Sequence, residues 1–271
     1  MVSPVEFWRD PCLPYVESRR AAGKGGRYRA HSLRAFSIGA IDRGTMAFTS
    51  GDGTTHLLKR GAVVVIAPER VFTCTPATDD PWSYQLLNVG QEWMRQGGGK
   101  PFDGQESVWD HAPIQIHRSQ ARYDQFSELN SILFSAARLE LKAAALAAFV
   151  ADLGAVEGDV VVHAPHYGAA SSELHAVMSR LRGRLTNRPP LDELARLAGM
   201  DRYQLIRAFR TETGLTPLAW HTDQRIQEAR LQVRSGRALA HVAASLGFSD
   251  QSHFQRVFKA YVGMTPIQYR S

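Results

Sequence analysis

The first ~115 residues alternate between short apolar stretches and residues typical of turns. Phe36–Ile41, Ala62–Ala67 and Trp82–Val89 are such stretches, and glycine or proline stands between them, for example at Gly51 and Pro68. Apolar runs of this length, separated by turn residues every ~8–12 positions, are typical of β-strands that form a sandwich or a barrel. We therefore predict an all-β N-terminal part.

From about Arg122 the apolar residues recur every three or four positions, which is the period of an amphipathic helix. The pattern predicts two helices, at about 122–135 and 138–153. Their apolar faces could pack on the β domain, on each other or on a second copy of the protein. Residues 154–170 are rich in Gly, Ala and Pro, and we interpret them as a linker between domains.

The last ~100 residues are predicted to be helical almost throughout. A helix at about 171–185 begins with Ser171, a plausible N-cap, and Pro189-Pro190 follows its end. Residues 217–234 form one long predicted helix with Pro217 in its first turn. At ~1.5 Å per residue this helix spans ~27 Å, close to the ~34 Å between successive major grooves on one side of a DNA duplex.

This helical part contains a weak internal repeat. LDELARLAGM at 191–200 aligns with LAHVAASLGF at 239–248, at an offset of 48 positions. After one extra residue, Ser249, the offset becomes 49, and GLTP at 214–217 aligns with GMTP at 263–266. Two units in register, each ended by the same turn, are much stronger evidence than one.

Each unit has the pattern of a helix-turn-helix. A short first helix ends at a glycine, Gly199 or Gly247, which can adopt a left-handed conformation. A polar cap then begins the second helix: Asp201 in the first unit, and Ser249 or Asp250 in the second. One face of the second helix is apolar and the other carries Arg and Gln, which can form paired hydrogen bonds with guanine and adenine. The alternative is an ordinary helical bundle with polar residues facing water.

Composition agrees with a soluble globular protein of one large or two smaller domains. Residues 171–271 contain 15 Lys and Arg against 8 Asp and Glu, a balance of +7, whereas residues 1–170 contain 17 against 18, a balance of −1. A basic block beside a neutral one indicates a module that binds a polyanion. The two cysteines lie far apart, and neither a signal peptide nor a membrane-spanning run is present, so we expect a cytoplasmic protein.

The stretch AHVAASLGFSDQSHFQRVFKAYVGMTPIQYR at 240–270 resembles the C-terminal signature of the AraC/XylS family of bacterial transcription regulators. The resemblance is strong over 171–271 and looser before it. It implies an α+β multidomain protein: a cupin-like effector-binding barrel at 1–118, a helical dimerisation region at 119–153, the linker at 154–170, and an all-α DNA-binding domain with two helix-turn-helix motifs at 171–271. It also implies double-stranded DNA, a small-molecule effector and a second copy of the chain as partners, and it admits RNA polymerase as a further one.

The resemblance places candidate DNA contacts on the second helix of each motif. Arg207 and Arg256 are the strongest of them, and Ile206 could contact a thymine methyl group. The complete set of candidates is Arg202, Tyr203, Gln204, Ile206, Arg207, Gln251, Ser252, Gln255 and Arg256.

A metal site is not expected in the barrel. Cupins often hold a metal through several histidines and a carboxylate, but His31 is the one histidine in the matching region, and a transition metal needs three or four ligands. The pairs His163 with His166 and His111 with His117 also lack further ligands. We predict no cofactor, and an apolar or mixed pocket whose candidate lining is Arg27, His31, Phe36, Phe72, Trp82 and Tyr84. Arg27 or Arg29 would pair with an anionic effector.

Two other functions remain open at this point. A cupin-type enzyme with an accessory helical domain would require a metal-ligand set that the sequence lacks, and we therefore expect no enzymatic activity. A DNA-binding regulator whose barrel serves only assembly would have no effector at all.

Overall fold

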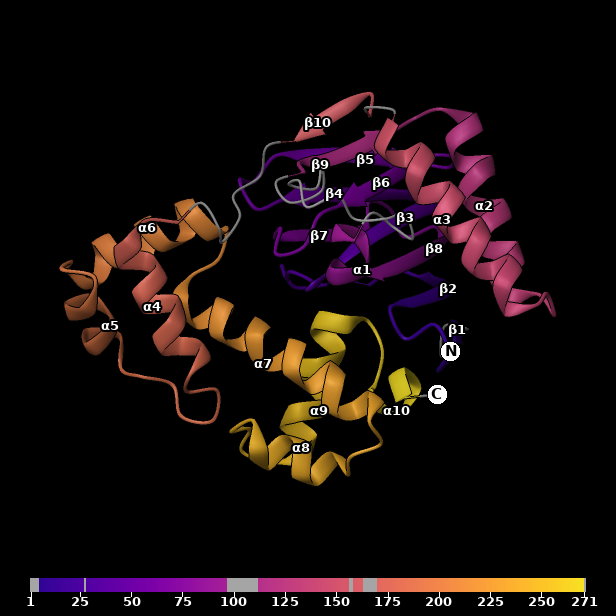
Figure 1. Ribbon diagram of the computed structural model, residues 1–271. Coiled ribbons are helices and arrows are strands. Elements are labelled where there is room, and N and C mark those ends of the chain that lie inside the picture. Colours follow the sequence, from indigo (N-terminus) through magenta and orange to yellow (C-terminus); the bar gives the residue numbers. More distant parts are fainter. Residues whose placement is uncertain (1–4, 27, 97–111, 156–157, 163–169, 271) are drawn as a thin grey trace.

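The computed structural model describes residues 5–26, 28–96, 112–155, 158–162 and 170–270. The first part of the chain consists of strands that build two antiparallel sheets (Figure 1). The larger sheet has the order β1-β2-β8-β3-β6-β9-β10, and the smaller has the order β5-β4-β7. The strand bounds are β1 Val5–Arg9, β2 Val16–Lys24, β3 Ala35–Arg43, β4 Thr45–Ser50, β5 Thr55–Lys59, β6 Val63–Ile66, β7 Phe72–Pro76, β8 Pro81–Gly90, β9 Ile114–His117 and β10 Val160–Val162.

The larger sheet has apolar side chains on both faces because a layer packs on each. Along β3, Phe36 and Ile38 face two helices, α2 (Gln120–Phe134) and α3 (Leu139–Ala155). Gly39 and Ile41 face the smaller sheet and a cavity between the sheets. This alternation is the two-residue period of a strand. The predicted helices at 122–135 and 138–153 correspond closely to α2 and α3, which pack on each other and on the sheet.

The stretch 154–170, interpreted from its composition as a linker, contains part of the sheet. Val160–Val162 forms β10, which pairs antiparallel with Ile114–Ile116 of β9. Three consecutive β-branched valines favour an extended chain that can add to a sheet edge, and this outweighs the surrounding Gly and Ala.

The described C-terminal part, residues 170–270, consists of helices joined by turns and loops. Its helix bounds are α4 Ser172–Arg182, α5 Leu191–Leu197, α6 Arg202–Thr213, α7 Pro217–Arg234, α8 Leu239–Ser245, α9 Gln251–Val262 and α10 Pro266–Arg270; a short helix in the first part is α1 Gln91–Arg95. α5 with α6, and α8 with α9, are the two predicted helix-turn-helix units. α7 has the predicted bounds and joins the two units, each of which has its own apolar core.

The turns of both units follow the sequence pattern. Gly199 and Gly247 have φ of +64° and +68°, the left-handed conformation expected there. Asp201 accepts hydrogen bonds from the amides of Tyr203 and Gln204, and Asp250 accepts one from His253, so both aspartates are N-caps. The fold is therefore α+β, with a sheet-rich part followed by a helical part.

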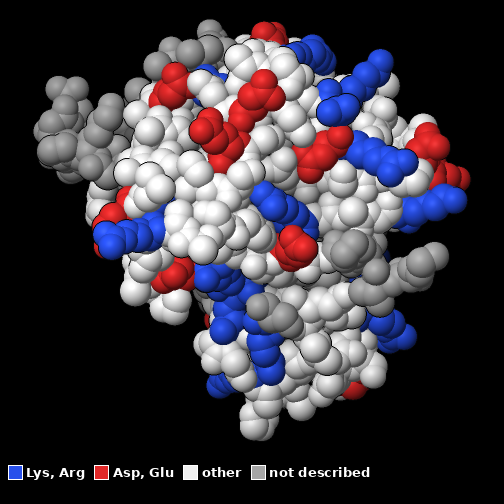
Figure 2. All heavy atoms as spheres, turned by 90° about the vertical axis from the view of Figure 1, so that its right-hand side faces the viewer, with Lys and Arg blue, Asp and Glu red and all other residues white. Residues whose placement is uncertain are grey.

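The helical part lies beside the barrel on the side away from α2 and α3 (Figure 1). α7 runs along the boundary between the two parts, and its buried residues include Asp223 and Gln227, which bond to the barrel. The charges follow this division: on the face shown in Figure 2, Lys and Arg predominate in the lower region, where Figure 1 places the helical part, and both signs mix above. Among the described residues, no helix is long and apolar enough to cross a membrane.

Candidate nucleic-acid interface and ligand cavity

The outward faces of α6 and α9 carry the residues that the sequence predicts to contact DNA. Seven of the nine are exposed, whereas Ile206 and Gln255 are half-buried. The opposite faces bury Leu205 and Phe209 in α6, and Phe254 and Phe258 in α9. Each helix therefore has the amphipathic division that a helix entering a groove requires.

Two of the polar candidates on α6 already have partners within the protein. The Gln204 side chain accepts a hydrogen bond from the Asp201 amide and completes a capping box. Arg202 forms an ion pair with Asp192 of α5. Of the other candidates on this helix, Tyr203 is 78% exposed, and Arg207 is exposed beside a groove that it forms with the turn Ser50–Gly53 of the barrel.

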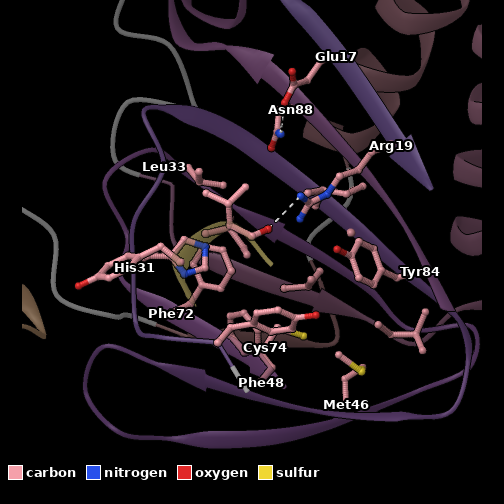
Figure 3. A pocket seen from close by; sticks show the side chains of 18 of the residues that line it. Glu17, Arg19, His31, Leu33, Met46, Phe48, Phe72, Cys74, Tyr84 and Asn88 are labelled. Carbon is pink, nitrogen blue, oxygen red and sulfur yellow. Dashed lines mark hydrogen bonds between the residues drawn. The ribbon is translucent and has the colours of Figure 1, made fainter. Parts of the chain in front are cut away.

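A cavity lies between the two sheets and opens toward the helical part (Figure 3). Its volume is about 90 Å³, several times the ~10–15 Å³ that one water molecule needs by the same measure. Most of its wall is apolar or aromatic, including Phe48, Phe72 and Leu33. The far wall belongs to the helical part and consists of Arg230, Tyr261, Val262 and Tyr269. A molecule in the cavity would therefore touch both parts of the protein.

His31 and Phe72 hold one side of the cavity together. Their backbones form two hydrogen bonds, of 3.1 and 2.9 Å, and their rings lie 4.7 Å apart. Burial lowers the pKa of His31 to about 3, and the charges of Arg230 and Arg19 act in the same direction. The imidazole is therefore neutral at physiological pH and presents a ring nitrogen and an aromatic face to the cavity.

Two arginines give the cavity a positive region. Arg19 comes from β2 and Arg230 from α7, and the Nε atoms of both are buried without a hydrogen-bond partner among the described residues. Arg19 reaches the carbonyl of Val262 at 3.5 Å and lies 5.4 Å from the centre of the Tyr84 ring. Burial is the main cause that lowers the pKa of Arg230.

The nearest carboxylate, Glu17, is occupied by other groups. It pairs with Arg9 at 2.9 Å and with Arg234 at 3.4 Å, and Asn88 donates a hydrogen bond to it at 3.1 Å. These bonds hold the pKa of Glu17 below its usual value in spite of burial, which raises it. The cavity therefore keeps a surplus of positive charge at Arg19 and Arg230.

The structure brings three of the six predicted pocket residues to the cavity: His31, Phe72 and Tyr84. Phe36 does not line this cavity, because its position in β3 turns it toward α2 and α3. Trp82 is also absent from the cavity wall and packs in the barrel core, where its indole N–H donates to the carbonyl of Gly25. Arg27 lies outside the described residues, and Arg29 is absent from the cavity wall.

Sequence reasoning missed Arg19 and Arg230. Arg19 lies next to Arg20 in a strand, and a strand alone does not reveal which of two neighbours faces inward. Arg230 belongs to the predicted long helix, where an arginine is normally a surface residue. Within the described part of the chain, no three His, Cys, Asp or Glu residues gather as metal ligands. His111, His163 and His166 lie outside that part.

Comparison with known families accounts for both halves of the chain. Residues 13–149, half of the chain, match the family described as the AraC-like ligand binding domain, and residues 194–271 match a helix-turn-helix domain. The chain belongs to the AraC family of transcription regulators. The barrel is thus the family's ligand-binding domain, and the helical part is its DNA-binding domain.

Individual relatives agree with this assignment. The chain is 25% identical to YbfI of Bacillus subtilis, an HTH-type transcriptional regulator, over 246 residues that cover 90% of this chain and 87% of YbfI. It is 39% identical to the arabinose operon regulatory protein of Escherichia coli over 69 residues, 25% of this chain and 24% of that protein. Both relatives are named as regulatory proteins.

Among solved structures, the two-part fold is similar to ToxT of Vibrio cholerae. One ToxT structure aligns with a TM-score of 0.55 and 11% identity, and covers 93% of this chain and 96% of ToxT. A ToxT structure bound to an unsaturated fatty acid aligns with a TM-score of 0.56 and 12% identity, and covers 100% of this chain and 95% of ToxT. At this identity the likeness shows the fold alone.

Proposed function

We propose that this AraC-family regulator responds to a small anionic molecule bound in the cavity between the barrel and α7. The observation that carries the proposal is the composition of the cavity wall, to which both domains contribute. Because α7 joins the two helix-turn-helix units, a ligand that contacts Arg230 acts on the element that sets their spacing. Effector binding is thereby coupled to the arrangement of the DNA-binding surface.

The arginines set the charge of the ligand. Each guanidinium has a buried Nε without a hydrogen-bond partner among the described residues, and an anion that accepts from this Nε removes the cost of leaving it unpaired. The remaining wall is apolar and aromatic, so the body of the ligand would be apolar too. A compact carboxylic acid, aromatic or with a short aliphatic chain, satisfies both conditions. The carboxylic acids bound in ToxT structures are of the same chemical class.

For DNA recognition we propose that the basic domain first anchors on phosphates and that α6 and α9 then contact bases. Arg207 and Arg256 are exposed and have no ion-pair partner among the described residues, so both are available for guanine. The other seven predicted residues surround them. Gln204 would have to leave its capping position in order to contact a base.

We also propose that the chain acts in the cytoplasm as a dimer, with the barrel close to 1–118, the dimerisation region close to 119–153 and the DNA-binding domain close to 171–271; of the stretch 154–170, Val160–Val162 belongs to the sheet of the barrel and not to a linker. The outward side of α3 supports the dimer, because Leu141 is 54% exposed there and Ala144 and Ala148 follow on the same side. RNA polymerase is a further proposed partner. Light scattering at micromolar concentration tests the dimer directly.

The decisive experiment selects bound sequences from a random pool of duplex DNA with the full-length protein. A recurrent pair of half-sites supports the function, and failure to enrich any sequence contradicts it. Thermal-shift measurements then compare benzoate and octanoate with the neutral benzamide and octanol. Stabilisation by the carboxylates alone is expected, whereas equal stabilisation by the neutral compounds would contradict the anionic ligand.

A further inference from the structure

Two arginines lie between the two helix-turn-helix units without a counter-ion. Arg225 is close to the middle of α7, and Arg188 stands three residues before the start of α5. Neither forms an ion pair among the described residues. The Nε and Nη2 atoms of Arg225 are buried and have no hydrogen-bond partner in the described part of the chain. We call these two residues the inter-unit arginines.

The loop between α4 and α5, which contains the first of these arginines, is fixed at both of its sides. The His221 ring of α7 donates from Nε2 to the carbonyl of Arg184 at 3.0 Å. The Thr186 hydroxyl donates to the carbonyl of Ser245, the last residue of α8, at 3.1 Å. The backbone of Thr186 also packs on Gly247 in the turn before α9. The loop is therefore held by α7 and by the second unit at once.

The fold keeps the inter-unit arginines near each other although their charges repel. The Arg225 guanidinium stacks on the Phe248 ring at 4.0 Å. Burial lowers the pKa of Arg225, and the charge of Arg188 acts in the same direction. Burial and these two charges also lower the pKa of His221. Positive charge is therefore disfavoured at this place, and an anion would relieve it.

The inter-unit arginines lie on the side where the recognition helices, α6 and α9, would meet DNA. The glycines that end both helices lie against the barrel, at Gly51 and Tyr28. The N-terminal ends, which contact base edges in a helix-turn-helix, therefore point away from the barrel (Figure 1). The loop between α4 and α5 lies on that same side, beside the turn before α9 (Figure 1). Arg188 precedes α5, and the first helix of such a motif crosses the DNA backbone.

We infer that Arg188 and Arg225 together hold one backbone phosphate of the DNA, between the two half-sites. When two recognition helices enter successive major grooves, the backbone that separates these grooves passes between the units. A phosphate there supplies the negative charge that neither arginine finds within the protein, and guanidinium groups bind phosphate by charge-assisted hydrogen bonds. Such a contact fixes the register of the protein on the duplex without reading sequence. This inference rests on the proposed DNA binding and names a phosphate contact that sets the spacing of the half-sites.

Salt dependence separates this contact from a base contact. Fluorescence anisotropy measures the affinity of the full-length protein for its selected duplex and for an unrelated duplex of equal length, at several KCl concentrations. Arg188→Met and Arg225→Met should each lose roughly tenfold on both duplexes, so that the ratio of the two affinities is unchanged. In the double variant, the slope of log affinity against log salt should become shallower by about 0.9, the value for one phosphate.

Arg234→Met is the matched control. Arg234 also lies on α7, but it pairs with Glu17 of the barrel at 3.4 Å. The substitution removes the same charge from the same helix on the side away from the proposed phosphate. Its affinity for both duplexes should stay within about twofold of wild type.

Neutral methylphosphonates then locate the phosphate on the DNA. Each phosphate between the half-sites of the selected duplex is replaced in turn. At one position, wild type and Arg234→Met should lose roughly tenfold in affinity, because the charged acceptor is gone. The double variant of Arg188 and Arg225 should lose less than about twofold at that position, because it no longer makes the contact.

The inference is overturned if the double variant keeps the wild-type salt slope, or if it stays as sensitive as wild type at every methylphosphonate. A reduced preference for the selected duplex would also overturn it, since the arginines would then read bases or support the recognition helices. Stabilisation of wild type alone by inorganic phosphate, with DNA affinity equal in all variants, would indicate a site for a free anion instead. If one substitution prevents folding, as judged by the melting curve, the other single variant is tested against the methylphosphonates. If wild type itself selects no DNA, the proposed function fails as well.

Discussion

Replacing Arg230 by methionine should produce two opposite effects on thermal stability. Methionine keeps most of the side-chain volume but removes a guanidinium whose Nε is buried without a partner. Removing a buried donor that has no hydrogen-bond partner should raise the free energy of unfolding by about 1–3 kcal/mol. At about 2–4 °C per kcal/mol for a chain of this size, the ligand-free variant should melt several degrees above wild type.

The same substitution should abolish most of the response to an anionic ligand. A hydrogen bond to a charged group contributes about 1.5–3 kcal/mol, so affinity for a carboxylate should fall roughly 10- to 150-fold. Differential scanning fluorimetry with and without benzoate or octanoate measures both effects, and calorimetric titration gives the affinity. The expected pattern is a higher melting temperature without ligand and a smaller ligand-induced increase.

Arg225→Met is the matched control. Arg225 also lies on α7 and has buried nitrogen atoms without partners, but it stacks on Phe248 at 4.0 Å and is not part of the cavity wall. Its replacement should leave the ligand response intact. The reasoning is refuted if Arg230→Met binds the carboxylates as wild type does, or if both variants lose the response equally.

Further predictions concern DNA contact, capping, titration and backbone conformation. Arg256→Ala should cost about 1–3 kcal/mol of binding and relax specificity at one base pair; unchanged gel shifts with the selected site would reject the contact. Asp201→Ala removes the cap of α6 and should lower the free energy of unfolding by about 1 kcal/mol in chemical denaturation, whereas no change would mean that the cap is dispensable. Burial raises the pKa of Asp223 from 3.8 to about 6, so the folded state favours its protonated form and the stabilisation is lost as pH rises through 6. The free energy of unfolding of wild type minus that of Asp223→Asn should therefore fall by about 2 kcal/mol between pH 4 and 7, and a flat difference would contradict the shifted pKa. Gly247→Ala should prevent stable folding of the second unit, because φ is +68° and a Cβ would lie 1.9 Å from the Thr186 carbonyl oxygen; a normal melting curve would refute this.

The parts of the fold that sequence predicts well depend on neighbouring residues. Gly199, Asp201 and Pro217 act within one helical turn of themselves, so the pattern around each defines a helix end without knowledge of the rest of the chain. For this reason α7 was predicted closely, from Pro217 to about Arg234. The repeat of this pattern then indicated the DNA-binding domain.

The cavity depends on contacts between distant residues, which such patterns do not encode. Arg19 and Arg230 approach each other because α7 docks on the barrel, and no local pattern marks either as inward-facing. Phe36 shows the same difficulty within a single strand, since a shift of one residue decides whether a side chain meets helices or the cavity. The hydrogen bond between Ser32 of the barrel and Asp223 of α7 likewise joins two residues that are far apart in the sequence, so no local pattern predicts it.

The two glycines that end the recognition helices, Gly214 and Gly263, occupy equivalent places in the duplicated units, and both touch the barrel. Neither position has room for a side chain larger than a hydrogen atom. The backbone at each glycine is left-handed, and a Cβ would also collide with Gly51 at Gly214 or with the Tyr28 ring at Gly263. A change elsewhere that created space would relieve the crowding and leave the dihedral strain. A substitution at either glycine would therefore need two separate compensations, one for the backbone conformation and one for the contact with the barrel.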